Sequence, residues 1–194
     1  ARTAALALAE KLGIKFSEGL VKNRYIGRTF IMPNQKIRKK SIKYKLNPMR
    51  LQIEGKKILL VDDSIVRGNT SKQIVEMVRD AGAKKVYFAA FSPMIVSPCL
   101  YGIDIPTKEE LIASGRTKEE VRKFVGADAL FYADLKDTIK SCELGNPKVK
   151  TYCAACFSGK YPTGDITPAV LKKNAENRCG DYACDRLDDQ LELV

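Results

Sequence analysis

The sequence contains no histidine among its 194 residues. A catalytic triad or a metal site built on histidine is therefore excluded within this chain. It also has no apolar run near the roughly 18 residues of a membrane-spanning helix, and its start lacks the charged region and apolar core of a secretory signal. We therefore expect no membrane span and a cytoplasmic location.

Acidic residues are outnumbered, with 34 Lys and Arg against 23 Asp and Glu and a net charge of +11. Much of the positive charge lies between residues 22 and 50, where few aromatic residues are interleaved. Such charge is typical of nucleic-acid binders and equally of proteins that bind a polyanionic small molecule. The scarcity of aromatic residues there favours the second class, so we expect no nucleic-acid partner.

Residues 56–70, with the sequence KKILLVDDSIVRGNT, carry the strongest pattern in the chain. The apolar residues 58–61 predict a short buried strand. Asp62 and Asp63 follow, then a polar loop containing Gly68. After the loop, apolar residues recur at helical spacing until Gly82, a helix stop signal. The predicted order is strand, acidic pair, loop, helix.

This order suits one particular ligand. The start of a helix presents free N–H groups and a positive dipole end to a phosphate, and Gly68 lets the backbone approach closely. Asp62 and Asp63 suit ribose hydroxyls or Mg²⁺ near a polyphosphate. Together they predict 5-phosphoribosyl 1-pyrophosphate as the ligand. The alternative is an ordinary strand-to-helix connection with exposed acids.

The stretch resembles the phosphoribosyl-pyrophosphate signature of type I phosphoribosyltransferases. Residues 22–33, 45–47 and 101–104 further resemble the amidophosphoribosyltransferases, also called glutamine phosphoribosylpyrophosphate amidotransferases. The resemblance covers roughly residues 1–165 and identifies the chain with the C-terminal phosphoribosyltransferase part of that family. It implies an α/β fold, with a parallel sheet flanked by helices and a C-terminal extension.

The pattern along the chain supports this fold class, because strands and helices alternate. We expect strands at 16–21, 58–61, 86–90 and 130–132, and helices at 3–12, 70–81, 107–114, 117–126 and 135–142. Thr107 with Glu110, and Thr117 with Glu120, are capping-box candidates. Residues 1–145 form the expected phosphoribosyltransferase domain, which lacks its first strand. Residues 146–194 form the extension, whose last part, 174–194, is expected as a weakly packed helix or frayed tail.

The resemblance implies transfer of a phosphoribosyl group to ammonia, which gives 5-phosphoribosylamine and pyrophosphate in the first step of de novo purine synthesis. Asp62 and Asp63 would hold the ribose and Mg²⁺, while Lys22, Arg28 and Lys45 would meet the pyrophosphate. Tyr25 and Arg28, on a closing loop, are the catalytic candidates, with simple packing as the alternative for Tyr25. The 5-phosphate would be held by Ser64, Ile65, Val66, Arg67, Gly68, Asn69 and Thr70. Positioning and charge stabilisation can carry this chemistry without a side-chain nucleophile.

The chain has six cysteines, and disulfides are not expected in a cytosolic protein. Cys153 and Cys156 form a C-x-x-C pair, which is typical of a redox site, half a zinc site or two buried thiols. Some members of the resembling family hold a [4Fe–4S] cluster, and Cys99, Cys153 and Cys156 match three of its ligands. A cluster needs four thiolates, and the family's remaining ligand lies upstream of this chain. Packed thiols without a cluster are the alternative.

The resembling enzymes take ammonia from glutamine in a separate glutaminase domain, which we do not find in this sequence. The resemblance also implies purine nucleotides as feedback ligands, and we expect a homo-oligomer. Three other classes share parts of the pattern: a salvage phosphoribosyltransferase, a non-catalytic regulator that binds phosphoribosyl pyrophosphate, and a receiver-like domain with Asp62 or Asp63 as phosphoacceptor. The phosphate loop argues against the receiver-like domain.

Overall fold

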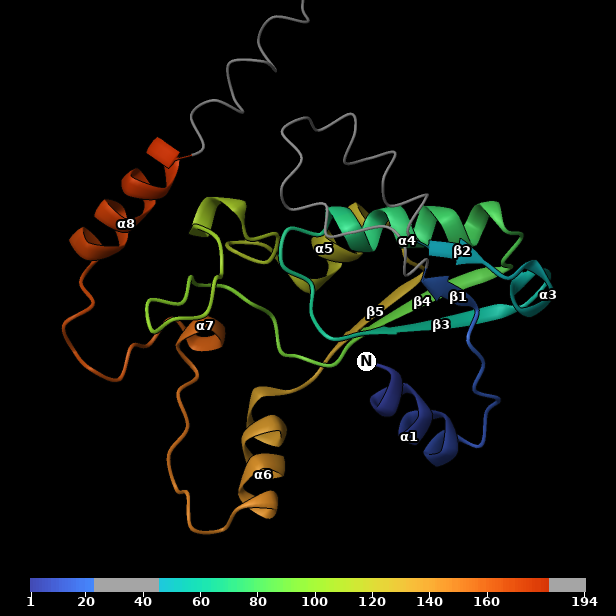
Figure 1. The fold of residues 1–194 in the computed structure, drawn as a ribbon, viewed down its shortest axis with the longest axis horizontal. Coiled ribbons are helices and arrows are strands. Elements are labelled where there is room, and N and C mark those ends of the chain that lie inside the picture. Colours follow the sequence, from blue (N-terminus) through green and yellow to red (C-terminus); the bar gives the residue numbers. More distant parts are fainter. Residues whose placement is uncertain (23–45, 182–194) are drawn as a thin grey trace, which may run out of the picture.

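A parallel sheet lies at the centre of the computed structural model, which describes residues 1–22 and 46–181 (Figure 1). Its strands are β3 (Lys57–Asp62), β4 (Lys85–Ala90) and β5 (Ala129–Tyr132), hydrogen-bonded in the order β3-β4-β5. Asp62 lies opposite Ala90, which lies opposite Tyr132. The predicted α/β fold with a parallel sheet is confirmed, and the carboxyl ends of its strands meet at one edge.

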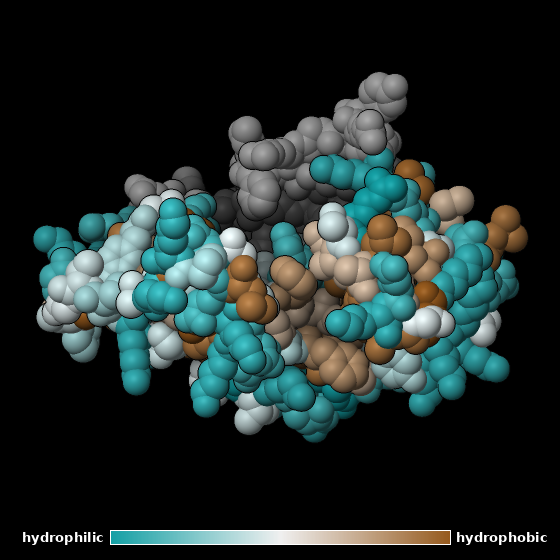
Figure 2. Space-filling model, turned by 90° about the horizontal axis from the view of Figure 1, so that it is seen from below, coloured by the Kyte–Doolittle hydropathy of each residue, from teal (hydrophilic) through white to brown (hydrophobic). Residues whose placement is uncertain are grey.

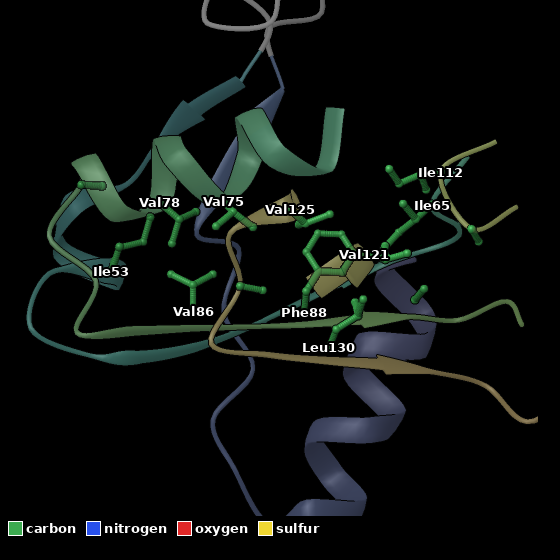
Figure 3. Close-up of a cluster of buried hydrophobic side chains, with 14 residues drawn as sticks. Ile53, Ile65, Val75, Val78, Val86, Phe88, Ile112, Val121, Val125 and Leu130 are labelled. Carbon is green, nitrogen blue, oxygen red and sulfur yellow. The ribbon is translucent and has the colours of Figure 1, made fainter. Parts of the chain in front are cut away.

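One face of the sheet is covered by α4 (Asn69–Asp80) and α5 (Lys118–Val125). Both helices place valines at helical spacing towards the strands, so each buries one face. The valine and aromatic side chains between these layers are 0–1% exposed (Figure 3). Each such side chain contributes about 1.5–3 kcal/mol when buried. This layer fixes the position of the loop that joins β3 to α4.

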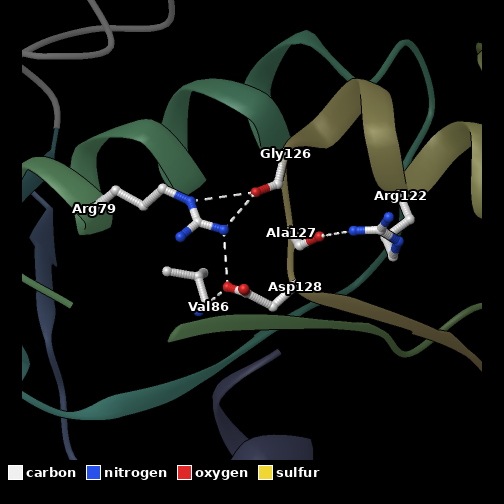
Figure 4. Close-up of polar contacts among 6 residues, drawn as sticks. All are labelled: Arg79, Val86, Arg122, Gly126, Ala127 and Asp128. Atoms are coloured by element: carbon white, nitrogen blue, oxygen red, sulfur yellow. Dashed lines mark hydrogen bonds and ion pairs between the residues drawn. The ribbon is translucent and has the colours of Figure 1, made fainter. Parts of the chain in front are cut away.

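A polar network joins α4, the α5–β5 connection and β4 (Figure 4). The carboxylate of Asp128 accepts a hydrogen bond from the backbone N–H of Val86 at 2.8 Å and pairs with Arg79 at 2.8 Å. Arg79 also donates to the carbonyl oxygen of Gly126 at 2.8 and 3.3 Å. These bonds hold the end of α5 beside the start of β4, which sets where β5 begins.

The opposite face of the sheet is covered less completely by the described residues. Helix α1 (Arg2–Leu12) lies against β3 and ends at Gly13, whose φ of 63° allows the left-handed cap. Helix α6 (Leu135–Gly145) follows β5. Phe131 points to this face by strand alternation and stays 53% exposed. Figure 2 views the molecule from this side and shows apolar side chains gathered between hydrophilic margins.

A second, antiparallel sheet pairs β1 (Leu20–Lys22) with β2 (Leu46–Pro48), and α3 (Arg50–Ile53) follows it. The strand predicted at 16–21 is therefore wrong at its start. Its partner β2 has only three residues and pairs with Leu20–Lys22. Of residues 16–19, only the carbonyl oxygen of Gly19 accepts a backbone hydrogen bond among the described residues, at 2.8 Å from the N–H of Met49. The sequence pattern also predicted neither β2 nor α3.

Two further helical predictions need correction. Residues 107–114 form only the short 3-10 helix η2 (Lys108–Glu110). In the C-terminal part, α7 (Ala155–Ser158) precedes α8 (Pro168–Asp181), which begins at Pro168 rather than at residue 174. Proline suits the first turn of a helix because its missing N–H would have no partner there. In the part of the chain that the structure describes, no helix has both the length and the apolar content to cross a membrane.

A candidate active site at the end of the central strand

The predicted phosphate loop lies where β3 ends and α4 begins, at the carboxyl edge of the parallel sheet. The strand ends at Asp62 and the helix begins at Asn69. The carbonyl oxygens of Asp62 and Asp63 each accept a 2.9 Å hydrogen bond, from the N–H groups of Phe91 and Ser92. The residues after β4 therefore hold the acidic pair in place. This edge is where open α/β sheets bind ligands.

Each of the two carboxylates accepts a backbone hydrogen bond through one of its oxygens. Oδ1 of Asp62 accepts the N–H of Asp63 at 2.9 Å, and Oδ1 of Asp63 accepts the N–H of Ser64 at 2.8 Å. Burial raises the pKa of Asp62 and the charge of Asp63 adds to the rise, against the lowering effect of the hydrogen bond from the Asp63 N–H. Two adjacent carboxylates fit a hard cation such as Mg²⁺.

The first turn of α4 is open to an anion. Its N-cap is Gly68, which has no side chain to bond the first N–H groups, and no side-chain cap is formed. The N–H of Lys72 bonds the carbonyl oxygen of Gly68 at 2.9 Å, which leaves the N–H groups of residues 69–71 without an intrahelical partner. These N–H donors and the positive end of the α4 dipole both point to the space in front of the N-terminus of α4.

Gly68 is required for two reasons that the structure makes specific. Its φ of 79° lies in the left-handed region, which other residues rarely adopt. A Cβ at this position would lie 3.0 Å from Cε1 of Phe124 and 3.2 Å from Cγ1 of Ile112. The close approach expected from the sequence is therefore made to the protein's own side chains, behind the loop.

The segment after η2 forms the wall behind the loop. The N–H of Ile112 donates to the carbonyl oxygen of Val66 at 2.9 Å, and Leu111 and Ile112 are 1% and 5% exposed. Leu111 has an extended backbone, with ψ of 117°. The predicted helix stops here because Leu111 is extended and residues 112–115 form a turn, which places Leu111 and Ile112 in the core.

The structure brings the seven loop residues together and gives their side chains different roles. Ile65 is 1% exposed in the main core and Val66 packs against a second apolar cluster, so only their backbones face a ligand. Arg67 pairs with Glu110 at 2.9 Å. Lys22 lies exposed at the end of β1, on the second sheet. Tyr25, Arg28 and Lys45 lie outside the described residues.

Sequence reasoning missed Tyr132, which lies in the same row of the sheet as Asp62. Its hydroxyl is buried and has no hydrogen-bond partner among the described residues. Burial raises the pKa of Tyr132 to about 12, so the hydroxyl keeps its proton at neutral pH and remains a donor. Strand register would have found it, because Tyr132 ends the second strand from β3.

The cysteines form a separate group. Cys99 and Cys156 are half-buried against the cluster of Ile95, Ile105 and Leu111, while Cys153 is exposed. Burial and the neighbouring Cys99 raise the pKa of Cys156, which favours its thiol form. Over residues 1–22 and 46–181, no three His, Cys, Asp or Glu side chains are arranged to hold a metal ion. This thiol set does not by itself form a cluster site, so the cluster stays a prediction.

Comparison with known proteins defines the class first. Residues 1–92, which include β3, the acidic pair, the loop and α4, match the family described as "Phosphoribosyl transferase domain". With the parallel sheet and the open helix start at its carboxyl edge, this defines a phosphoribosyltransferase domain.

The similar proteins narrow the class. The chain is 54% identical to the amidophosphoribosyltransferase of Pseudomonas aeruginosa over 91% of this chain and 35% of that protein. It is 52% identical to the amidophosphoribosyltransferase of Methanocaldococcus jannaschii over 83% of this chain and 33% of that protein. A solved structure of glutamine phosphoribosylpyrophosphate amidotransferase from B. subtilis, complexed with ADP and GMP, has a TM-score of 0.72 and 44% identity, covering 87% of this chain and 38% of that one.

The chain is similar to the phosphoribosyltransferase part of the amidophosphoribosyltransferases, as its motifs indicated. It spans about a third of the length of the curated relatives it matches.

Proposed function

We propose that this chain transfers the phosphoribosyl group of phosphoribosyl pyrophosphate to ammonia, giving 5-phosphoribosylamine and pyrophosphate in the first step of de novo purine synthesis. The observation that carries the proposal is the meeting of the acidic pair and the uncapped first turn of α4 in one loop. The names of the relatives support the same reaction.

In this proposal, the backbone N–H groups of residues 64–70 and the hydroxyls of Ser64 and Thr70 bind the 5-phosphate. Asp62 and Asp63 hold the ribose hydroxyls and Mg²⁺. When bound, Mg²⁺ neutralises charge on the pyrophosphate that leaves. Lys22, Arg28 and Lys45 meet the same pyrophosphate, and Tyr25 and Arg28 complete the site.

The chemistry needs charge stabilisation more than a nucleophile. The bond between the anomeric carbon and pyrophosphate breaks, and pyrophosphate leaves with the electron pair. Ammonia then forms the new C–N bond and loses a proton. Positive charge develops at the anomeric carbon, where the carboxylates of Asp62 and Asp63 stabilise it.

The proposal extends to the wider assembly. Residues 1–145 form the catalytic domain and residues 146–194 its extension, in a cytoplasmic homo-oligomer whose ammonia comes from a glutaminase domain. Purine nucleotides are its feedback ligands, and the B. subtilis relative in complex with ADP and GMP supports this.

Cys99, Cys153 and Cys156 would supply three thiolates to a [4Fe–4S] cluster. Iron and sulfide analysis after anaerobic purification tests the cluster, and an absence of iron would end that part of the proposal.

Pyrophosphate release tests the reaction. The full-length protein is supplied with phosphoribosyl pyrophosphate and Mg²⁺, and with ammonia, glutamine or a nucleobase as the acceptor. We expect release with ammonia. Release with a nucleobase alone would instead identify a salvage enzyme, and binding without release would identify a regulator.

A paired variant locates the chemistry. Replacing Asp62 and Asp63 by asparagine removes both charges at similar volume, and we expect the rate to fall at least about a hundredfold. Asp80→Asn is the control, because Asp80 is an exposed acid at the far end of α4. If the double variant released pyrophosphate as fast as Asp80→Asn, the proposed site would be wrong.

A further inference from the structure

The sequence Thr-Lys-Glu-Glu occurs twice, at residues 107–110 and 117–120. Both copies form a complete capping box in the structure. The second copy opens α5, a helix of 8 residues, whereas the first is followed by a 3-10 helix of only 3 residues. A capping box normally serves a helix that follows it. The first copy has almost no helix to serve, so its glutamate calls for another explanation.

The two glutamates differ in what they bond. Glu120 uses Oε2 for the N–H and hydroxyl of its own Thr117, both at 2.7 Å. Glu110 makes the equivalent bonds to Thr107 at 3.2 and 3.3 Å through Oε2. Its Oε1 accepts two further hydrogen bonds from Arg67, from Nε at 3.1 Å and from Nη2 at 2.9 Å. Glu110 therefore joins its turn to the phosphate loop.

A second contact runs beside this ion pair. The N–H of Ile112 bonds the carbonyl oxygen of Val66, and Ile112 shares the main core with Ile65. The loop residues 65–67 are thus attached to the segment 110–112 by a buried side chain, a backbone hydrogen bond and an ion pair. The side chains of Arg67 and Glu110 are 49% and 43% exposed. A pair this exposed contributes little to global stability, so its main effect is on the conformation of the loop.

We propose that Glu110 is a positioning residue, which holds Arg67 and thereby keeps the phosphate loop in the conformation that binds the 5-phosphate. The inference rests on the proposed function of that loop. Glu110 has no role in bond making or breaking. Without it, the loop spends part of its time in conformations that do not bind, and the apparent affinity falls in proportion to the competent fraction.

Electrostatics alone predicts the opposite change in ligand affinity when Glu110 is removed, so the direction of the measured change is decisive. Glu110 carries a negative charge beside a site for an anion, so removing that charge would strengthen binding if charge were its only influence. The positioning role predicts weaker binding. The direction of the change in affinity therefore separates the two accounts.

The experiment measures the Kd of the chain for ribose 5-phosphate and for phosphoribosyl pyrophosphate with Mg²⁺ by calorimetry. We expect Glu110→Ala to raise both Kd values about three- to tenfold, between the effects of exposed and of charge-assisted pairs. With ammonia as acceptor, KM for phosphoribosyl pyrophosphate should rise by the same factor while kcat is kept. Glu120→Ala is the matched control, since it breaks the equivalent capping box at Thr117, which does not contact the loop. Its Kd values should stay at those of the wild type.

A double-mutant cycle with Arg67→Met completes the test. If Glu110 acts through Arg67, the double variant binds no more weakly than Arg67→Met alone. Effects that multiply, or a Glu110→Ala variant that binds as tightly as the wild type or more tightly, would overturn the inference and leave the proposed function standing. A wild-type chain that bound neither ligand would overturn both.

Discussion

Replacing Gly68 by alanine tests the two structural requirements at the centre of the loop. An alanine held at φ 79° has left-handed geometry, which costs about 1–2 kcal/mol. Its Cβ would also lie 3.0 Å from Phe124 and 3.2 Å from Ile112, and such overpacking costs about 1–3 kcal/mol. The free energy of unfolding should therefore fall by about 2–5 kcal/mol. At about 2–4 °C per kcal/mol in a chain of this size, Tm should fall by about 4–20 °C.

Urea denaturation followed by circular dichroism measures the loss. Gly115→Ala is the control, because Gly115 has φ 67° but no atom of the described residues lies within 4 Å of the position that a Cβ would take there. It should lose only the backbone part, about 1–2 kcal/mol. Adding Phe124→Ala to Gly68→Ala removes the closest contact, so the double variant should lose less than the sum of the two single losses. Equal losses for Gly68→Ala and Gly115→Ala would refute the packing argument.

Four other substitutions test the acidic pair, the polar network and the core by the same method, one of them as a control for the core. Burial raises the pKa of Asp62 above its ordinary 3.8. The native protein therefore loses stability as the pH rises through that raised pKa. Asp62→Asn, which does not titrate, should be more stable than the wild type by a margin that grows from pH 4 to pH 7. Asp128→Ala leaves the buried Val86 N–H without its acceptor and should cost about 1–3 kcal/mol. Phe88→Ala, at a side chain 1% exposed, should cost about 3–5 kcal/mol, whereas Phe131→Ala, 53% exposed on the other face, should change stability by less than about 1 kcal/mol.

The sequence was sufficient where the signal is local. The apolar run of β3, the helical spacing in α4 and the glycine after α1 each depend on neighbouring residues, and all three elements were predicted correctly. The parallel sheet followed from the alternation of strands and helices. The helix predicted at 117–126 was confirmed as α5, with Gly126 as its left-handed cap.

Prediction failed where a distant partner decides the structure. The strands β1 and β2 have three residues each, and they pair across residues 23–45. Such short strands carry too little periodicity to be recognised without their partner. The two capping boxes show the same limit, because identical Thr-Lys-Glu-Glu sequences begin an α-helix in one case and a 3-10 helix of 3 residues followed by a turn in the other.

The candidate site combines both kinds of information. Its residue types were readable from the sequence, because a phosphate loop needs free N–H groups, a glycine and adjacent acids in order. What holds the loop was not readable, since the contacts come from Ile112 and Phe124, which lie 44 and 56 residues beyond Gly68. A change at either position should therefore disturb ligand binding although neither residue belongs to the loop. The local sequence specifies which groups can bind the phosphate, and packing against residues distant in the sequence determines whether those groups stay in place.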